Sequence, residues 1–156
     1  MTKRAVLTRT TMIAALFISL FGLGSCTKHV TQVVDQGFSA VYTIHQTDWK
    51  VDTYTGDPNS TDPAKQPLNA YAVALNVPEV DDKIVANGAV MVYISFDGGA
   101  TYDAVPTEEN QVIYNALHWK STVYIGIRAK DETAPDISKL QDILAKVVIL
   151  DATPLD

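Results

Sequence analysis

The chain has 156 residues, of which 47% are apolar, and its 12 basic and 18 acidic side chains give a formal net charge of −6 with one cysteine. This length fits one ordinary domain, one cysteine excludes a disulfide framework within the chain, and the excess of acids argues against a nucleic-acid-binding surface. The charged fraction of 19%, together with many β-branched and aromatic residues, argues against disorder.

Residues 1–25 have the layout of a secretory signal peptide. The start is basic, an uncharged run of 12 residues extends from Met12 to Leu23, and two small residues follow. A helix of this run would span only about 18 Å, whereas the hydrocarbon core of a bilayer is about 30 Å thick. The length therefore argues against a transmembrane anchor.

The end of this segment, Leu23-Gly24-Ser25-Cys26, resembles the bacterial lipobox. The resemblance implies cleavage between Ser25 and Cys26, attachment of a diacyl lipid to the Cys26 sulfur, and acylation of the new N-terminus. Each buried methylene contributes about 0.8 kcal/mol, so two or more acyl chains would attach the protein firmly to a membrane. The expected location is the cell envelope, and the outer rather than the inner membrane, because Thr27 stands where inner-membrane lipoproteins often carry aspartate. Whether the protein faces the periplasm or the cell surface stays open.

Cleavage would leave 131 residues with a charge of −9, because three basic residues and no acid lie in the signal peptide. Residues 26–37 are predicted to form the lipidated N-terminus and a tether, and residues 38–156 a single domain. Such an acidic body would repel nucleic acid and anionic membrane faces. A chain of this length can bury one substantial core without disulfides or metal.

Beyond the tether, apolar residues mostly recur at every second position, which predicts strands. Taken in chain order, the predicted strands are 38–46, 49–54, 70–77, 89–96, 101–105, 112–117, 122–129 and 146–150. A polar loop with three prolines is expected over 55–67. A short helix is expected over 79–87, where Pro78 suits the first helical position and Gly88 the end, and a second over 135–144 from its apolar spacing. The pattern favours an all-β fold, an antiparallel β-sandwich of immunoglobulin-like or similar type with about seven strands and one or two short helices.

One turn is predicted especially clearly. Asp97-Gly98-Gly99 separates two predicted strands, and its glycines allow the positive φ that a hairpin turn requires. The stretch Ser95–Tyr102 resembles an Asp-box, the S-x-D-x-G-x-T-W hairpin of sialidase-type propellers, with Tyr102 in place of Trp. A propeller needs several such blades, so the resemblance implies a structural turn and no sialidase activity.

A wider resemblance covers about residues 70–151. The segments NVPEV at 76–80, NGAVMVY at 87–93 and KVVIL at 146–150, with Trp49 before them, resemble a recurring set of small secreted or lipid-anchored Bacteroidota proteins. These motifs mark turns and strands and contain no catalytic pattern. The resemblance therefore implies a fold and a compartment rather than an activity.

The sequence contains no pattern typical of catalysis. His29 lies in the tether, and His45 and His118 are not at metal-ligand spacing. No nucleophile elbow, P-loop or dinucleotide fingerprint is present, and Cys26 is no longer a thiol once acylated. Residues 57–62 offer oxygen ligands for calcium but lack the EF-hand glycine and glutamate, so a solvated turn is favoured. No catalytic residue, metal or cofactor is predicted.

Four residues are the candidate ligand contacts: Trp119, His118, Trp49 and Tyr102. Tyrosine and tryptophan suit surfaces that stack on sugars or on partner loops. The favoured alternative is that Trp49 belongs to the core and Trp119 closes a hairpin edge, because large aromatic side chains usually bury most of their area. The sequence thus predicts a lipid-anchored envelope protein with a non-enzymatic binding or structural role. A carbohydrate- or peptide-binding module and, less favoured, an envelope hydrolase are the alternatives, and the glycan or protein partner stays unidentified.

Overall fold

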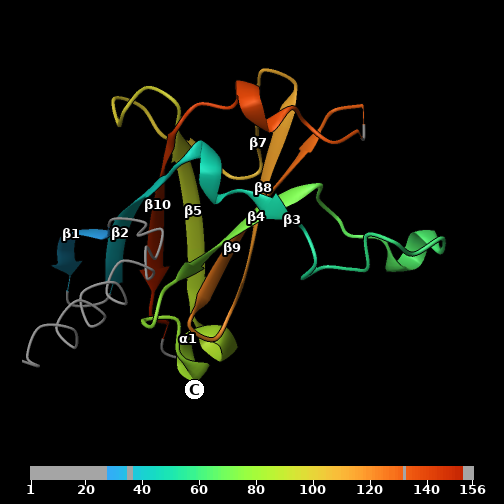
Figure 1. Cartoon of the computed structure of the whole chain (residues 1–156). Coiled ribbons are helices and arrows are strands. Elements are labelled where there is room, and N and C mark those ends of the chain that lie inside the picture. The colour runs from blue at the N-terminus through green and yellow to red at the C-terminus, as the bar shows by residue number, and fades with distance from the viewer. Residues whose placement is uncertain (1–27, 35–36, 132, 153–156) are drawn as a thin grey trace, which may run out of the picture.

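Two antiparallel sheets form the body of the computed structural model, which describes residues 28–34, 37–131 and 133–152 (Figure 1). The first sheet has the strand order β1(Lys28–Val34), β2(Gly37–Ile44), β10(Ile143–Leu150), β5(Ala89–Ser95), β6(Asp103–Ala104). The second sheet has the order β3(Lys50–Val51), β4(Tyr71–Asn76), β9(Thr122–Ala129), β8(Val112–Trp119), β7(Thr107–Glu109). The predicted all-β sandwich is therefore confirmed, and three of its strands, β3, β6 and β7, are only two or three residues long.

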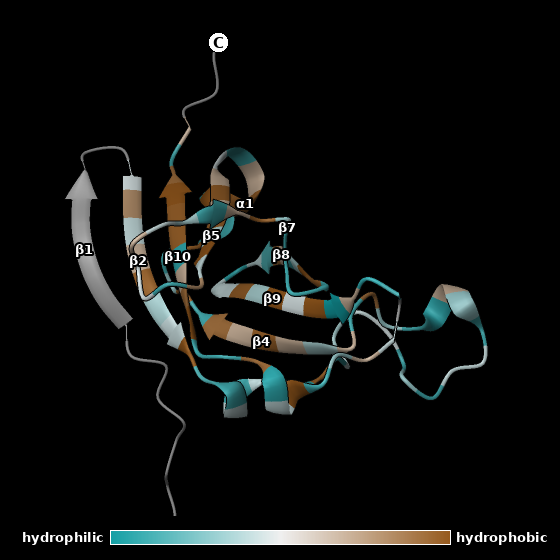
Figure 2. Ribbon diagram, turned by 90° about the horizontal axis from the view of Figure 1, so that it is seen from above, coloured by the Kyte–Doolittle hydropathy of each residue, from teal (hydrophilic) through white to brown (hydrophobic). Residues whose placement is uncertain are grey.

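The two sheets cover each other's apolar faces. Figure 2 shows β4 and β9 of the second sheet running across the direction of β2 and β10 of the first. Alternate residues of the central strands face the space between the sheets, as the period of two requires. These core residues include Ala40, Tyr42, Ile44, Val73, Leu75, Val123, Ile125, Ile127, Ile143, Ala145, Val147 and Ile149. Each fully buried large aliphatic side chain contributes about 1.5–3 kcal/mol relative to its exposed state.

The predicted helix over 135–144 is wrong. Only Ile137–Lys139 form a 3-10 turn, which the Asp136 side chain caps by accepting a hydrogen bond from the Ser138 amide at 3.0 Å. Ile143 and Leu144 instead begin β10, which pairs with β2 on one side and with β5 on the other. The alternating burial along β10 and its two sets of ladder hydrogen bonds outweigh a helical spacing of four apolar residues.

The other differences are two strands that the sequence does not predict and one predicted strand that is shorter. Residues 28–34, predicted as part of the tether, form β1 at the edge of the first sheet. Of the predicted strand over 49–54, only Lys50–Val51 pair, with β4. The short strand β7 at Thr107–Glu109 was not predicted. The only α-helix among the described residues is α1(Asp82–Asn87).

Helix α1 begins later than predicted. Its N-cap is Asp81, whose side chain accepts a hydrogen bond from the Ile84 amide at 2.8 Å. Pro78 therefore lies before the helix rather than at its first position. Gly88 does end the helix, and its amide donates to the Ile84 carbonyl at 2.9 Å.

The connection between β3 and β4 positions the candidate site. Figure 1 shows its middle part reaching away from the sandwich, with the 3-10 turn Pro63–Lys65 near the tip. The predicted polar loop over 55–67 is thus confirmed. Its two ends return to the second sheet, where the Asp52 amide donates to the Ala70 carbonyl at 3.1 Å.

Candidate functional site

Three aromatic side chains meet on the outer face of the second sheet, the face turned away from the core. Tyr124 of β9 packs against Trp119 of β8 with ring centroids 5.8 Å apart. Tyr54, from the connection after β3, lies 5.4 Å from Tyr124 and 6.1 Å from Trp119 between centroids. We call Tyr54, Trp119 and Tyr124 the aromatic cluster.

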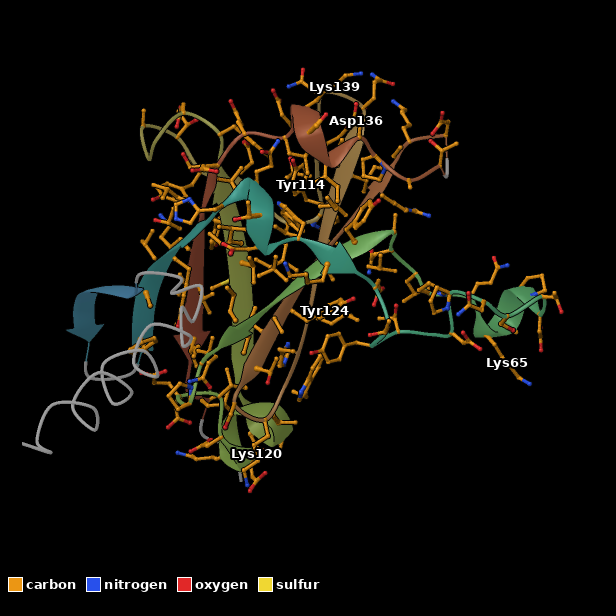
Figure 3. The ribbon with its side chains drawn as sticks, in the orientation of Figure 1. Lys65, Tyr114, Lys120, Tyr124, Asp136 and Lys139 are labelled. Carbon is orange, nitrogen blue, oxygen red and sulfur yellow. The ribbon has the colours of Figure 1, made fainter. Side chains whose placement is uncertain are left out.

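Strand alternation places this cluster outside the core. On β9, Val123 and Ile125 belong to the core, so Tyr124 between them points to the opposite face. Tyr124 is 0% exposed because the other two rings cover it, whereas Tyr54 is 66% and Trp119 38% exposed. Tyr124 and the core residue Tyr114 are both labelled in Figure 3. In the aromatic cluster, Tyr124 is therefore buried, and Tyr54 and Trp119 are the two exposed aromatic side chains.

A buried carboxylate holds the backbone beside Tyr54. Asp52 is 0% exposed and accepts hydrogen bonds from the amides of Tyr54, at 3.0 Å, and Thr55, at 3.3 Å. The Thr55 hydroxyl also donates to this carboxylate. Burial acts to raise the pKa of Asp52, but the hydrogen bonds from Thr55, the Tyr124 hydroxyl and the Tyr54 amide outweigh it, so the pKa lies below its ordinary value.

Two asparagines connect this carboxylate to the sheet. The buried Asn69 donates from Nδ2 to Asp52 at 3.3 Å and accepts at Oδ1 from Asn115 Nδ2 at 2.5 Å. Asn69 lies directly over Gly126, where an added Cβ would come within 2.3 Å of the Asn69 Cγ and Nδ2 atoms. We call Asp52, Thr55, Asn69 and Asn115 the polar network. It fixes the loop that carries Tyr54 to the outer face of β8 and β9.

The Tyr124 hydroxyl lies next to this network. Burial, followed by the hydrogen bond to the Asp52 carboxylate and by its charge, raises the pKa of Tyr124 above its ordinary value, so the phenol stays neutral. The hydroxyl is buried beside Asp52, Asn69 and Thr55, and the ring packs between Trp119 and Tyr54.

A hollow adjoins the aromatic cluster on the β4 side. It is a depression of about 540 Å³ that is open to solvent. Tyr54 forms one wall and the small side chains of Ala72 and Ala74 lie along it, with Lys50 and Asp48 among the polar lining residues. Tyr54 therefore contacts the aromatic cluster and also borders the hollow.

The predicted contact residues separate into different environments. Trp119 belongs to the aromatic cluster, and His118 beside it is exposed. Trp49 is 4% exposed and packs against Tyr114 at 6.3 Å between centroids, so its proposed role as a ligand contact is wrong and the core alternative holds. Tyr102 lies on the first sheet's side, with the Lys146 ammonium 3.8 Å from its ring centroid.

Sequence reasoning missed Tyr54, Tyr124 and the polar network. The sequence pattern places Tyr54 in the predicted strand over 49–54 and Tyr124 in the predicted strand over 122–129. One signal was present: Gly126 interrupts a strand rich in large side chains, and an interior glycine often indicates close approach of another group. That signal does not identify Asn69 as the approaching residue.

The hairpin at Asp97 is built as its sequence predicts. The Ser95 hydroxyl donates to Asp97 Oδ1 at 2.7 Å, and the Thr101 amide and hydroxyl donate to the same carboxylate at 3.0 and 2.7 Å. These bonds, the Thr101 amide first, hold the pKa of Asp97 far below its usual range. Gly98 and Gly99 have φ of +72° and +101°. The carboxylate closes the turn.

The remaining polar candidates are also engaged in local structure. His45 Nδ1 lies 2.7 Å from the Asp142 carboxylate, and this hydrogen bond raises the pKa of His45. In the loop considered for calcium, Asp57 accepts from the Asn59 amide and Asp62 from the Ala64 amide, as in a solvated turn. Within the described ranges, no group of three His, Cys, Asp or Glu could hold a metal ion.

The predicted signal peptide and Cys26 lie outside the described residues. In the part of the chain that the structure covers, no helix has the length and apolarity needed to cross a membrane. Comparisons with known proteins found no matching family model, no similar curated protein and no similar solved structure.

Proposed function

We propose that the protein is a lipid-anchored domain of the cell envelope that binds a ligand or partner through its aromatic cluster and performs no catalysis. The observation that carries the proposal is the placement of Tyr54 and Trp119, two large and partly exposed side chains, on a buried tyrosine. Exposed aromatic groups of this kind supply contact area at low conformational-entropy cost. The lipobox around Cys26 supports the anchor.

The electrostatics of the described aspartates fit structural roles. The aspartates with shifted pKa in the described part of the chain all shift downward: Asp52, Asp97, Asp131, Asp136 and Asp142. Hydrogen bonds from nearby turns and loops cause these shifts, which fits structural roles.

Trp119 provides the test of this function. The chain has two tryptophans, so Trp49→Phe leaves Trp119 as the sole indole and conserves an aromatic side chain in the core. The protein, isolated from membranes in detergent, is titrated with neutral oligosaccharides, acidic oligosaccharides and a library of short peptides while Trp119 emission is recorded. We expect a saturable change with one of these classes. If none of them changes the emission, and calorimetry on the unsubstituted protein detects no heat either, the proposed binding role is refuted.

A further inference from the structure

The aromatic cluster and the adjoining hollow offer two kinds of contact side by side. Tyr54 separates Trp119 from the hollow and takes part in both surfaces. The planes of the Tyr54 and Trp119 rings are inclined by 39° with centroids 6.1 Å apart, so together they form a shallow, bent aromatic surface. A ligand that matches this surface must have an apolar face and must also carry hydrogen-bonding groups along its edge.

The polar side chains of the hollow supply hydrogen-bonding groups of both types. The Lys50 ammonium donates to the Thr47 carbonyl at 2.9 Å and, as an ammonium, has three donors in total. Asp48, whose Oδ2 accepts a hydrogen bond from the His45 amide at 2.8 Å, and Thr53 also line the hollow. One cation and one anion border the hollow, so the site has no strong preference for a charged ligand.

The net charge of the whole chain also favours an uncharged ligand. With 18 acidic and 12 basic side chains, the protein repels polyanions at long range. A neutral ligand is not repelled in this way. This disfavours acidic polysaccharides and nucleic acids relative to uncharged ligands.

On these grounds, and resting on the proposed function, we infer that the aromatic cluster and the hollow bind a neutral oligosaccharide. A pyranose ring has an apolar face of C–H groups that can lie on Tyr54 or Trp119, while its hydroxyl groups reach Lys50 and Asp48.

The polar network makes this site preorganised. Asp52 and Asn69 hold the backbone at Tyr54 before any ligand arrives. Ordering a loop on binding costs free energy, and a loop that is already fixed avoids much of that cost. Asp52 and Asn69 are therefore positioning residues and do not themselves contact the sugar.

The test is calorimetric titration of the protein, isolated in detergent, with neutral tetrasaccharides of glucose, galactose, mannose and N-acetylglucosamine. An oligogalacturonate and the short-peptide library are titrated in parallel. We expect a neutral tetrasaccharide to bind, with a Kd that does not change between low and high salt, because no net charge is neutralised. An acidic ligand bound through charge would instead weaken as salt increases.

Four variants locate the site. Tyr54→Ala is expected to weaken binding about tenfold or more, a change of about 1.4 kcal/mol, whereas Tyr54→Phe keeps the ring and retains affinity. Ala74→Leu should also weaken binding, because the larger side chain fills part of the hollow without removing a contact. Tyr93→Ala, a tyrosine of the first sheet, is the matched control and should bind as the unsubstituted protein does. Each variant is first checked for an unchanged thermal unfolding transition.

The outcomes separate this inference from the proposed function. Binding of peptides without binding of any neutral saccharide would overturn the inference and leave the binding role intact. Saccharide binding that is unaffected by Tyr54→Ala and by Ala74→Leu would overturn the assignment of the site. Absence of binding by all classes would overturn both.

Discussion

Gly126→Ala is the substitution whose effect follows most directly from the geometry of the polar network. The new Cβ would lie 2.3 Å from both Cγ and Nδ2 of Asn69 and 2.7 Å from Oδ1. Contacts this short force Asn69 to move. Because Asn69 bonds both Asp52 and Asn115, its displacement breaks both hydrogen bonds.

The loss in the free energy of unfolding can be estimated from the two hydrogen bonds of Asn69. A neutral hydrogen bond contributes about 1 kcal/mol, and one to a charged group about 1.5–3 kcal/mol. Alanine recovers roughly 0.5–1 kcal/mol relative to glycine in a strand. The expected net effect of Gly126→Ala is therefore a loss of about 1.5–3.5 kcal/mol in the free energy of unfolding, together with release of the loop that carries Tyr54.

A double-mutant cycle measured by urea unfolding tests this reasoning. Asn69→Ala removes all three atoms that the new Cβ meets first. In that background Gly126→Ala should cost less than about 1 kcal/mol, because the steric conflict is gone and the two effects are not additive. An equal cost of Gly126→Ala in both backgrounds would refute the account of the polar network.

Three further substitutions test other parts of the description. Cys26→Ala should abolish incorporation of a fatty-acid analogue during growth and release the protein from the membrane fraction, and an unlabelled native protein would contradict the proposed anchor. Asp97→Ala should lower the melting temperature near neutral pH, since the depressed pKa means that this carboxylate stabilises the fold above its unfolded pKa and loses that effect as pH falls through the folded pKa. The raised pKa of His45 has the opposite sign: its ion pair stabilises the fold fully below the unfolded pKa and is lost as pH rises through the folded pKa. In an NMR titration the His45 midpoint should therefore fall toward its ordinary value in Asp142→Asn, and an unchanged midpoint would exclude this pairing as the cause.

The strands were predictable because their pattern is local. On β9, large aliphatic residues alternate with others, and β5 is a continuous run of β-forming apolar residues. The structure places these strands at Thr122–Ala129 and Ala89–Ser95, close to the predicted bounds. The Asp97 turn was predictable for the same reason, since its donors lie within four residues of the carboxylate. The prediction of a helix over 135–144 was wrong because the pairing of β10 with two neighbouring strands depends on residues far away in the sequence.

The candidate site was predictable only in part. Trp119 was selected as an aromatic residue at a strand end, and it does lie in the aromatic cluster. Tyr54 could not be selected in this way, because its position depends on Asp52 reaching Asn69, 17 residues later, and on the space above Gly126. Trp49 and Trp119 have the same side chain, and only the folded structure separates the core residue from the exposed one.

A crystal structure of the protein with its tightest-binding neutral oligosaccharide would locate the ligand. We expect a sugar ring lying against Tyr54 or Trp119, with hydroxyl groups directed toward Lys50 and Asp48 in the hollow. A saccharide bound elsewhere, for example against Tyr102 and Tyr93 on the first sheet, would contradict it.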